Sequence, residues 1–257
     1  MPASEMAREE GREMLRVEHV SVRFGGVQAL DDVSLGVRTG SVHGLIGPNG
    51  AGKTTLFNVI TGLTKPAIGT VALDGRDVTR TRPHRRARLG TARTFQRLEL
   101  FTSLSVRENV QVAADTARPI WHRYRGAASL VASALERVGL EDVADERVEA
   151  LPVGTARLVE LARALATTPR VLLLDEPASG LDREDTSALG QLLVGLARSG
   201  LAVLLVEHDM SLVMAQCDSI SVMDGGRVIA SGTPAEVQSS QVVRDAYLGV
   251  ATSGSTA

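Results

Sequence analysis

The hydrophobic residues of this chain form short runs of strand length, separated by stretches with helical spacing. Early in the chain the strand-like runs are Leu15 to Phe24, Val33 to Val37, Val42 to Ile46 and Thr70 to Leu73. Later, Val171 to Leu174 and Ala202 to Val206 are continuous apolar runs. Continuous runs of this length are typical of central parallel strands that are buried on both faces of a sheet.

The helical stretches lie between these runs. They are Thr55 to Ile60, Thr155 to Ala166 and Arg183 to Arg198. Alternating strands and helices predict an α/β fold, with a mainly parallel sheet and helices packed on both of its faces. Near the end of the chain, Ile220 to Met223 and Arg227 to Ile229 flank Asp224-Gly225-Gly226 and predict a β-hairpin.

The segment that begins at about residue 97 has a different character. It is mostly helix-compatible, at Val106 to Ala114 and again at Ala127 to Val138. We interpret it as a helical insertion between two parts of the α/β core. The segment contains Trp121 and Tyr124, and two interpretations of them stay open: they line a docking groove, or they belong to a small satellite core.

Composition excludes several classes of protein. The 257 residues, 44% of them hydrophobic, suit one large α/β domain with a substantial core. A net charge of −2 argues against a nucleic-acid binder that works through bulk charge. The single cysteine, Cys217, allows no internal disulfide and indicates a reducing compartment. Because no apolar run approaches the roughly 18–20 residues of a membrane span and the first residues lack a signal-peptide core, we expect a soluble, cytoplasmic protein.

One arginine-rich stretch deserves a separate interpretation. Its basic residues are Arg80, Arg82, His84, Arg85, Arg86 and Arg88. No aromatic residues interleave with them, so nucleic-acid binding is disfavoured. We interpret the stretch as a solvated helix face, from which Arg85 and Arg88 can also pair with acidic groups on a membrane partner.

A glycine-rich loop carries the first chemical motif. It follows the run Val42 to Ile46 and precedes a helical stretch, and its residues are Gly47, Pro48, Asn49, Gly50, Ala51, Gly52, Lys53 and Thr54. A loop of this type between strand and helix directs backbone N–H groups and the positive end of the helix dipole at a phosphate. Lys53 then reaches the β- and γ-phosphates, and the Thr54 hydroxyl can bind Mg²⁺.

The second motif consists of two acids after a buried strand. Asp175 and Glu176 follow the run Val171 to Leu174. Ligands of open α/β sheets bind at the carboxyl ends of the strands, so Asp175 is expected beside the phosphate loop, where it helps to hold Mg²⁺. Glu176 can polarise the water that attacks the γ-phosphate. His208 follows the run Ala202 to Val206 and is expected at the same sheet edge.

The order of these motifs resembles the nucleotide-binding subunit of ATP-binding cassette (ABC) transporters, from about Leu15 to Gly249. The resemblance implies a P-loop NTPase core with an N-terminal antiparallel β-subdomain and an inserted α-helical subdomain. It also implies one ABC ATPase domain over residues 15–250, a helical subdomain at about 97–165, and flexible tails at 1–14 and 251–257. ATP and Mg²⁺ are the implied ligands.

The resemblance also implies roles for individual residues. Phe24 takes the position that stacks on adenine, where the family often has tyrosine, and Thr55 joins the phosphate loop in binding the nucleotide. Gln96 senses Mg²⁺ and the γ-phosphate. Asp175 is the metal-side acid and Glu176 the catalytic base. The remaining implied contacts are made by Asp182, which closes a loop that acts across a dimer, and by His208, which contacts the γ-phosphate.

One motif departs from the family pattern. Where the family typically has Leu-Ser-Gly-Gly-Gln, this chain has Leu151-Pro152-Val153-Gly154-Thr155. In the family this segment binds the γ-phosphate held by the opposite subunit. Pro152 lacks a hydroxyl and an N–H, and Val153 disfavours a positive φ. Gly154 and the helix from Thr155 preserve part of the contact. Because one hydrogen bond to a charged group is worth roughly 1.5–3 kcal/mol, the trans contact is expected to weaken by about tenfold or more.

Further features resemble one subfamily. Thr91 to Gln96, the arginine-rich stretch before it and Ala246-Tyr247-Leu248-Gly249 are similar to branched-chain amino-acid importers. In that group two different ATPase subunits commonly pair, so the resemblance implies a heterodimer on the inner face of the cell membrane. Its partners are transmembrane permease subunits and, indirectly, a solute-binding protein, with no nucleic acid.

Three alternatives stay open at this point. Lipopolysaccharide-export ATPases share parts of the pattern and form homodimers. Soluble ABC proteins of DNA repair or translation are disfavoured, because only 55 residues separate Gln96 from Leu151 and the chain holds one cassette. A catalytically weak structural partner is disfavoured by the intact Glu176 and His208, but Pro152 and Val153 keep this alternative open.

Overall fold

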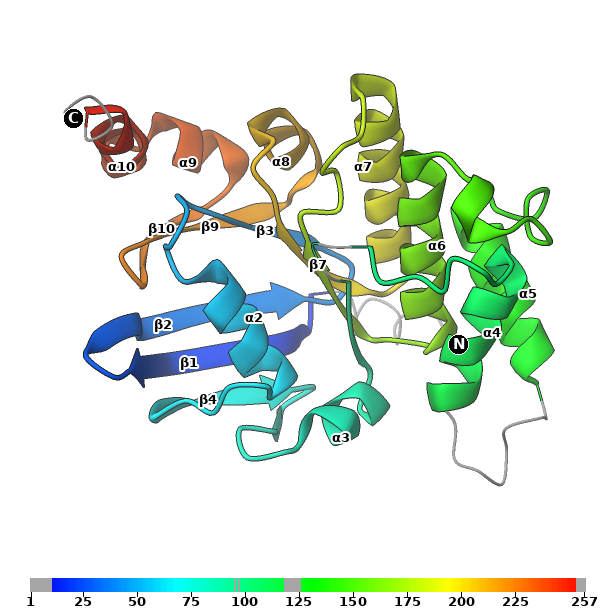
Figure 1. Ribbon diagram of the computed structural model, residues 1–257. Helices are drawn as coiled ribbons and strands as arrows, with labels where there is room; N and C mark the ends of the chain where they lie inside the picture. Colours follow the sequence, from blue (N-terminus) through cyan, green and yellow to red (C-terminus); the bar gives the residue numbers. More distant parts are fainter. Residues whose placement is uncertain (1–10, 95, 97, 118–125, 253–257) are drawn as a thin grey trace.

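The computed structural model describes residues 11–94, 96, 98–117 and 126–252, and within them two sheets form the framework (Figure 1). The larger sheet has six strands in the order β10-β9-β3-β8-β7-β6. The five strands from β9 to β6 in this order run parallel to one another. β10 closes the sheet as the antiparallel arm of a hairpin with β9. The strands are β3 (Val42–Ile46), β6 (Thr91–Arg93), β7 (Val171–Asp175), β8 (Ala202–Val206), β9 (Ser219–Asp224) and β10 (Arg227–Gly232).

The smaller sheet has four strands in the order β2-β1-β4-β5, all paired antiparallel. They are β1 (Glu13–Phe24), β2 (Val27–Arg38), β4 (Ile68–Leu73) and β5 (Arg76–Asp77). This sheet lies below the larger one in Figure 1, with α2 between them. The predicted α/β fold, with its antiparallel β-subdomain, is therefore confirmed.

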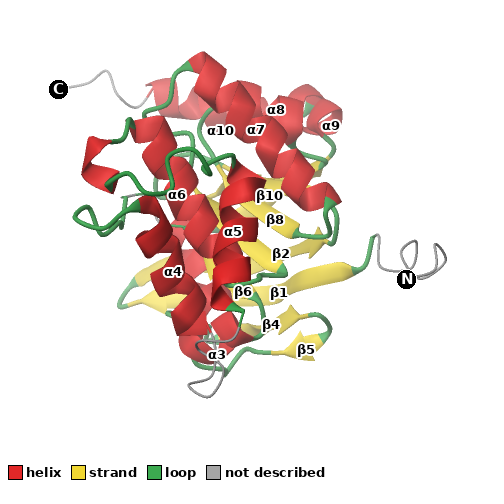
Figure 2. Ribbon diagram, turned by 90° about the vertical axis from the view of Figure 1, so that its right-hand side faces the viewer, coloured by secondary structure: helices red, strands yellow, loops and turns green. Residues whose placement is uncertain are grey.

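Helices cover the larger sheet and extend it to one side. They are α2 (Lys53–Thr61), α3 (Pro83–Arg88), α4 (Val106–Ala117), α5 (Ala127–Val138), α6 (Val153–Ala166), α7 (Arg183–Arg198), α8 (Met210–Gln216), α9 (Pro234–Ser239) and α10 (Gln241–Thr252). A short 3-10 helix, Val148–Ala150, precedes α6. Figure 2 shows α4, α5 and α6 grouped on one side of the molecule, which is the helical region expected from the sequence.

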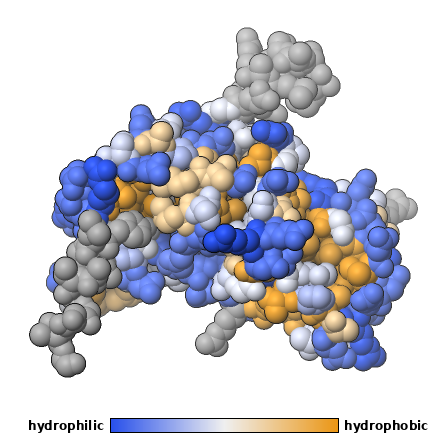
Figure 3. Space-filling view, turned by 90° about the horizontal axis from the view of Figure 1, so that it is seen from above, coloured by the Kyte–Doolittle hydropathy of each residue, from blue (hydrophilic) through white to orange (hydrophobic). Residues whose placement is uncertain are grey.

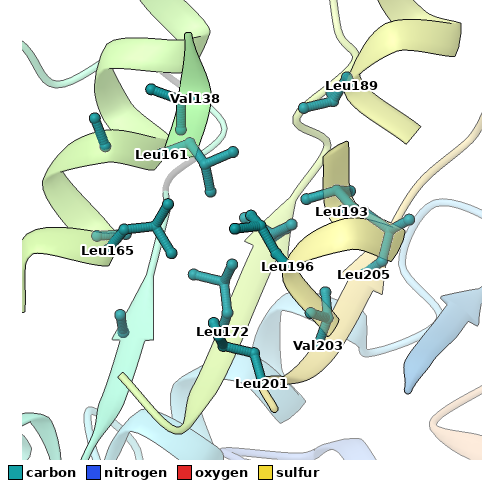
Figure 4. Close-up of a cluster of buried hydrophobic side chains, with 14 of the residues drawn as sticks. Val138, Leu161, Leu165, Leu172, Leu189, Leu193, Leu196, Leu201, Val203 and Leu205 are labelled. Carbon is teal, nitrogen blue, oxygen red and sulfur yellow. The ribbon is translucent and has the colours of Figure 1, made fainter. Parts of the chain in front are cut away.

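The central strands are buried on both faces, as their continuous apolar runs predict. Leu172 and Leu174 of β7 belong to one hydrophobic core, together with residues from α4 to α8. Val171 and Leu173, which alternate with them, belong to a second core shared with α2 and the antiparallel sheet. Figure 4 shows the first core, in which Leu172 lies among leucines of α6 and α7. Alternate side chains of one strand therefore hold two layers together.

The arginine-rich stretch corrects one prediction. Arg85 and Arg88 are exposed, but Arg86 has only 1% of its surface accessible. Its guanidinium donates to four carbonyl oxygens, those of Val59, Ile60, Thr79 and Thr81. The last carbonyls of a helix lack partners within the helix, so Arg86 is buried where it satisfies those at the end of α2. The stretch is consequently not a uniformly solvated face.

Several boundaries differ from the predicted ones. α6 begins at Val153 rather than at Thr155, and β1 already begins at Glu13. The short elements α3, α8 and α9 carry too few residues to show helical periodicity in the sequence. Trp121 and Tyr124 lie outside the described residues, as do the outer parts of both predicted tails.

The surface is mixed in character. Seen from above, hydrophilic residues cover much of the face, with separate hydrophobic patches between them (Figure 3). Among the described residues, no helix has the length and apolar content that crossing a membrane requires.

Candidate functional site

The phosphate loop joins β3 to α2 and is built on glycines whose backbone conformation other residues rarely adopt. Gly47, Gly50 and Gly52 have φ values of 150°, 82° and 101°, in the region that favours glycine. A Cβ atom at Gly47 would overlap the carbonyl oxygen of Met223, and one at Gly52 would lie 2.7 Å from the carbonyl oxygen of Ala29. The loop is therefore fixed against β9 and β2 on its inner side.

Lys53 lies inside this loop. Its ammonium group donates to the carbonyl oxygens of Gly47 at 2.5 Å and Pro48 at 2.9 Å. Burial lowers the pKa of Lys53, and the negative charges of Glu176 and Asp175 oppose that shift. Thr54, the next residue, is exposed at the start of α2. The loop thus combines the start of a helix, a lysine and a hydroxyl, which are the groups that bind phosphate in loops of this type.

Glu176 lies between two of the predicted site residues. Its Oε2 atom accepts a hydrogen bond from Nε2 of Gln96 at 2.8 Å, and its Oε1 atom lies 2.6 Å from Nε2 of His208. Glu176 has a φ of 51°, which is unusual for a residue other than glycine. Its backbone N–H bonds to the carbonyl of Val206 at 2.9 Å, which holds this turn against the end of β8. Sequence reasoning predicted that Glu176 and His208 lie at one sheet edge, whereas the place of Gln96 in the site was implied by the family resemblance alone.

Three side chains of helix α6 hold the backbone at Gln96 and Glu99. Arg157 donates to the carbonyl oxygen of Gln96 at 3.1 Å, and Glu160 accepts from the N–H of Glu99 at 3.1 Å. Arg163 donates to the carbonyl oxygen of Glu99. These three side chains recur every three residues and so share one face of the helix. The sequence analysis missed this role, although the spacing of the charges was visible.

Glu207 is a second residue that the sequence analysis missed. It is buried, with 4% of its surface accessible. Its carboxylate accepts hydrogen bonds from the backbone N–H of Ala178 at 2.7 Å and of His208 at 3.1 Å. Burial raises the pKa of Glu207, and the nearby charge of Glu176 adds to the rise. Glu207 therefore links the turn after Glu176 to the turn that carries His208.

The segment Leu151 to Thr155 lies at the start of helix α6. Pro152 caps the start of α6 in an extended conformation, and Val153 begins the helix with half of its surface exposed. Val153 does not have a positive φ, so the strain expected there is absent. Gly154 permits a close approach to Asp185, since a Cβ atom would lie 2.7 Å from its Oδ2.

Two further predicted residues lie at exposed positions. Asp182 caps α7, because its side chain accepts a hydrogen bond from the N–H of Asp185 at 2.8 Å. Phe24 pairs with Val27 at the tip of the β1–β2 hairpin, and 53% of its surface is accessible. No hydrogen bond within the described residues joins Phe24, Asp182 or the segment from Leu151 to Gly154 to the phosphate loop.

A groove of about 620 Å³ separates α3 and β6 from α4 and α6. Its lining combines basic, acidic and apolar side chains. They include Arg88, Thr94, Val112, Thr116, Glu160 and Arg163. Arg93 and Thr94 of this lining lie two or three residues before Gln96, so the groove and the site around Glu176 share one stretch of chain.

Comparison with known proteins agrees with this arrangement. The family model described as "ABC transporter" matches residues 30–179, more than half of the chain. The chain belongs to the ABC transporter family. A second model, described as "Branched-chain amino acid ATP-binding cassette transporter", matches residues 227–252 of this ABC cassette.

Individual relatives cover nearly the whole ABC cassette. The high-affinity branched-chain amino acid transport ATP-binding protein LivG of Salmonella typhimurium is 40% identical over 93% of this chain and 98% of its own length. BraF of Pseudomonas aeruginosa, with the same description, is 40% identical over 93% of this chain and 99% of its own. The lipopolysaccharide export system ATP-binding protein LptB of Haemophilus influenzae is 32% identical over 92% and 97%.

Solved structures give the same result. The ADP conformation of an ATP-binding cassette of an ABC transporter has a TM-score of 0.84 at 30% identity, covering 92% of this chain and 99% of that one. A dimeric post-hydrolysis cassette bound to ADP and Pi has a TM-score of 0.73 at 27% identity, covering 86% and 99%. The chain is an ABC-type ATPase and the ATP-binding subunit of an ABC transporter.

Proposed function

We propose that this ATPase drives an importer for branched-chain or other amino acids by binding and hydrolysing Mg²⁺-ATP at a head-to-tail dimer interface. The observation that carries the hydrolytic part is the position of Glu176, held between Gln96 and His208. A carboxylate in this position can orient and deprotonate an attacking water, while its two partners keep it in place.

The chain's residues fit Mg²⁺-ATP. The glycine loop leaves room for phosphate oxygens, and Lys53 needs only to leave two loop carbonyls in order to reach them. Thr54 and Asp175 would hold Mg²⁺, which neutralises phosphate charge when it is bound. Among the described residues, no cluster of three or more His, Cys, Asp or Glu side chains is suited to hold a metal, so these two ligands need phosphate oxygens and water to complete a shell. Phe24, exposed at its hairpin tip, supplies an aromatic face for adenine.

The dimer is the second part of the proposal. Among the described residues, no hydrogen bond joins Leu151, Gly154 or Asp182 to this chain's own phosphate loop. This arrangement is compatible with a role across an interface. The dimeric structure of a similar cassette supports such an interface. Because Pro152 offers the γ-phosphate neither a hydroxyl nor an N–H, we propose a heterodimer in which a different ATPase subunit completes this chain's site.

The groove between α3 and α4 is the proposed docking surface for a transmembrane permease subunit. It offers apolar Val112 beside the positive charges of Arg88 and Arg163. It also lies next to Gln96, so a bound permease segment would contact the stretch of chain that reaches Glu176. The ATPase would accordingly be a cytoplasmic protein, peripheral on the inner face of the membrane.

The C-terminal segment favours amino-acid import over lipopolysaccharide export. The match over residues 227–252 is to a branched-chain amino acid cassette family, and LivG and BraF support the same substrate class. The 32% identity to LptB keeps lipopolysaccharide export as the second candidate.

The proposal is tested by purifying the Glu176→Gln variant with and without its candidate partner. Mg²⁺-ATP should drive dimerisation in the mixture, as measured by light scattering. Dimerisation in neither sample would contradict the interface. Co-purification from membranes then separates the two transport classes, since it identifies the permease and the solute-binding protein. The basic groove residue Arg88 provides a test of docking: Arg88→Glu should abolish co-purification, whereas the exposed Arg227→Glu should not.

A further inference from the structure

Arg93 is the last residue of β6, and its side chain reaches the acid at the end of the neighbouring strand. β6 runs parallel to β7, with Arg93 opposite Leu173 and therefore two residues short of Asp175. The Nη2 atom of Arg93 donates to Oδ2 of Asp175 at 2.9 Å. Both side chains are more than nine-tenths buried, with accessible fractions of 8% and 9%. This ion pair lies in the interior and is shielded from solvent.

The same guanidinium has a second anchor on α2, the helix that begins at Lys53. Its Nη1 atom donates to Oδ1 of Asn58 at 2.7 Å, and the group lies over the ring of Phe57, 5.3 Å from the centroid. A planar guanidinium presents its donors in fixed directions. Satisfying both partners at once therefore fixes the orientation of Arg93 and, through it, of the Asp175 carboxylate.

The two carboxylate oxygens of Asp175 consequently have different roles. Oδ2 is engaged by Arg93, while no hydrogen bond within the described residues reaches Oδ1. A carboxylate that serves a metal is commonly held by a hydrogen bond to its other side, and loss of such a partner typically costs about 10- to 100-fold in metal affinity. Asp175 has this arrangement, because Arg93 holds one of its carboxylate oxygens.

We infer that Arg93 is a positioning residue for the metal-side acid, which it holds in the orientation that serves Mg²⁺ bound together with ATP. The inference rests on the proposed function, because it requires Mg²⁺ and ATP to meet at Asp175. The positive charge of Arg93 would by itself repel a cation. Positioning and charge therefore have opposite effects on Mg²⁺ affinity, and the experiment distinguishes them.

The test uses the full chain and a fluorescent ATP analogue titrated at a series of free Mg²⁺ concentrations. Two quantities are measured: the Kd of the analogue without Mg²⁺, and the Mg²⁺ concentration that gives half of the metal-dependent gain in affinity. In Arg93→Gln this concentration should rise by about tenfold or more, while the Mg²⁺-free Kd changes by less than about twofold. A residue that only stabilised the fold would change both quantities together. Arg107→Gln, which removes an exposed ion pair with Asp145, is the matched control and should change neither.

Two milder variants keep the test decisive if Arg93→Gln does not fold. Arg93→Lys retains the charge but cannot serve Asn58 and Asp175 at once, and Asn58→Ala removes only the second anchor. Both should raise the Mg²⁺ requirement by a smaller factor. An unchanged or lowered requirement in the variants that fold would overturn the inference. If the unaltered chain shows no Mg²⁺-dependent gain in nucleotide affinity, the proposed function fails instead.

Discussion

The Nε2 atom of His208 lies 2.6 Å from the Oε1 atom of Glu176, although 32 positions separate the two residues in the chain. They meet because Glu176 follows β7 and His208 follows β8, and these strands are parallel neighbours in the sheet. The contact brings the candidate base and its histidine together. The first prediction concerns this pair.

Glu176→Gln should lower the rate of ATP hydrolysis by roughly 10²- to 10⁴-fold, the usual contribution of a general base. Glutamine keeps the size of the side chain, so the affinity for ATP should stay within a few-fold of the original. Steady-state phosphate release and nucleotide titration measure the two quantities. Glu141→Gln, at an exposed position in the helical region, is the control and should leave both unchanged. Hydrolysis at the original rate in Glu176→Gln would remove Glu176 from the mechanism.

Replacing Pro152 with serine and Val153 with glycine should raise the ATPase activity of a homodimer by about tenfold or more, because one charged hydrogen bond of roughly 1.5–3 kcal/mol becomes possible. The measurement is turnover as a function of protein concentration. Val153→Gly alone controls for the loss of bulk. Equal activity in the original and the double variant would show that Gly154 and the start of α6 already provide an adequate contact.

Arg86→Met should destabilise the fold strongly, by about 2–4 kcal/mol, since buried carbonyl oxygens at the end of α2 lose their partner. Equilibrium denaturation gives the free energy of unfolding. The neighbouring Arg85→Met is a matched control, because Arg85 is exposed, and it should stay within about 0.5 kcal/mol of the original. A difference of less than that between the two variants would contradict the assigned role of Arg86.

His43 should make the fold sensitive to acid. Its ring lies between Ser219 and Ser221, with its nitrogens 2.8 and 2.9 Å from their Oγ atoms, and burial lowers its pKa from 6.5 to about 4. The unfolded chain then binds more protons than the folded chain between these two pH values. The stabilisation is complete above pH 6.5 and is lost as the pH falls towards 4, for a total of about 3 kcal/mol.

The His43 prediction is checked by measuring the free energy of unfolding at several pH values. His43→Gln should flatten the curve in the window between pH 6.5 and 4, and His84→Gln, at an exposed position, should not. A curve of unchanged slope in His43→Gln would show that other groups cause the acid sensitivity.

The central strands and the phosphate loop were predictable from local sequence. β3, β8 and α7 have the predicted bounds, because each combines a distinct apolar pattern with a clear start and end. The meeting of Glu176 and His208 followed from one rule, that the carboxyl ends of parallel strands share an edge. Gln96 was placed in the site only by the family resemblance. The roles assigned to these residues remain predictions.

The contacts of Arg86, Arg93 and Glu207 could not be predicted in the same way. Arg86 has the same neighbours in sequence as the exposed arginines around it, and only the position of α2 in space decides that it is buried. Arg93 and Glu207 form bonds across 82 and 29 positions of the chain. Such contacts depend on how the layers pack, which no local pattern records. The same holds for the start of α6, where an extended Pro152 allows the helix to begin at Val153, two residues before the predicted start.

The tight contact between Gly47 and Met223 makes the nucleotide site dependent on a distant part of the chain. The β9–β10 hairpin packs against the phosphate loop, and the N–H of Gly226 also bonds to the carbonyl of Ala51 at 3.2 Å. The branched-chain match, over residues 227–252, begins with the second strand of this hairpin. A change in the C-terminal region that shifted the hairpin would therefore alter ATP affinity without contacting the nucleotide. The end of the chain thus helps to set how tightly ATP is bound.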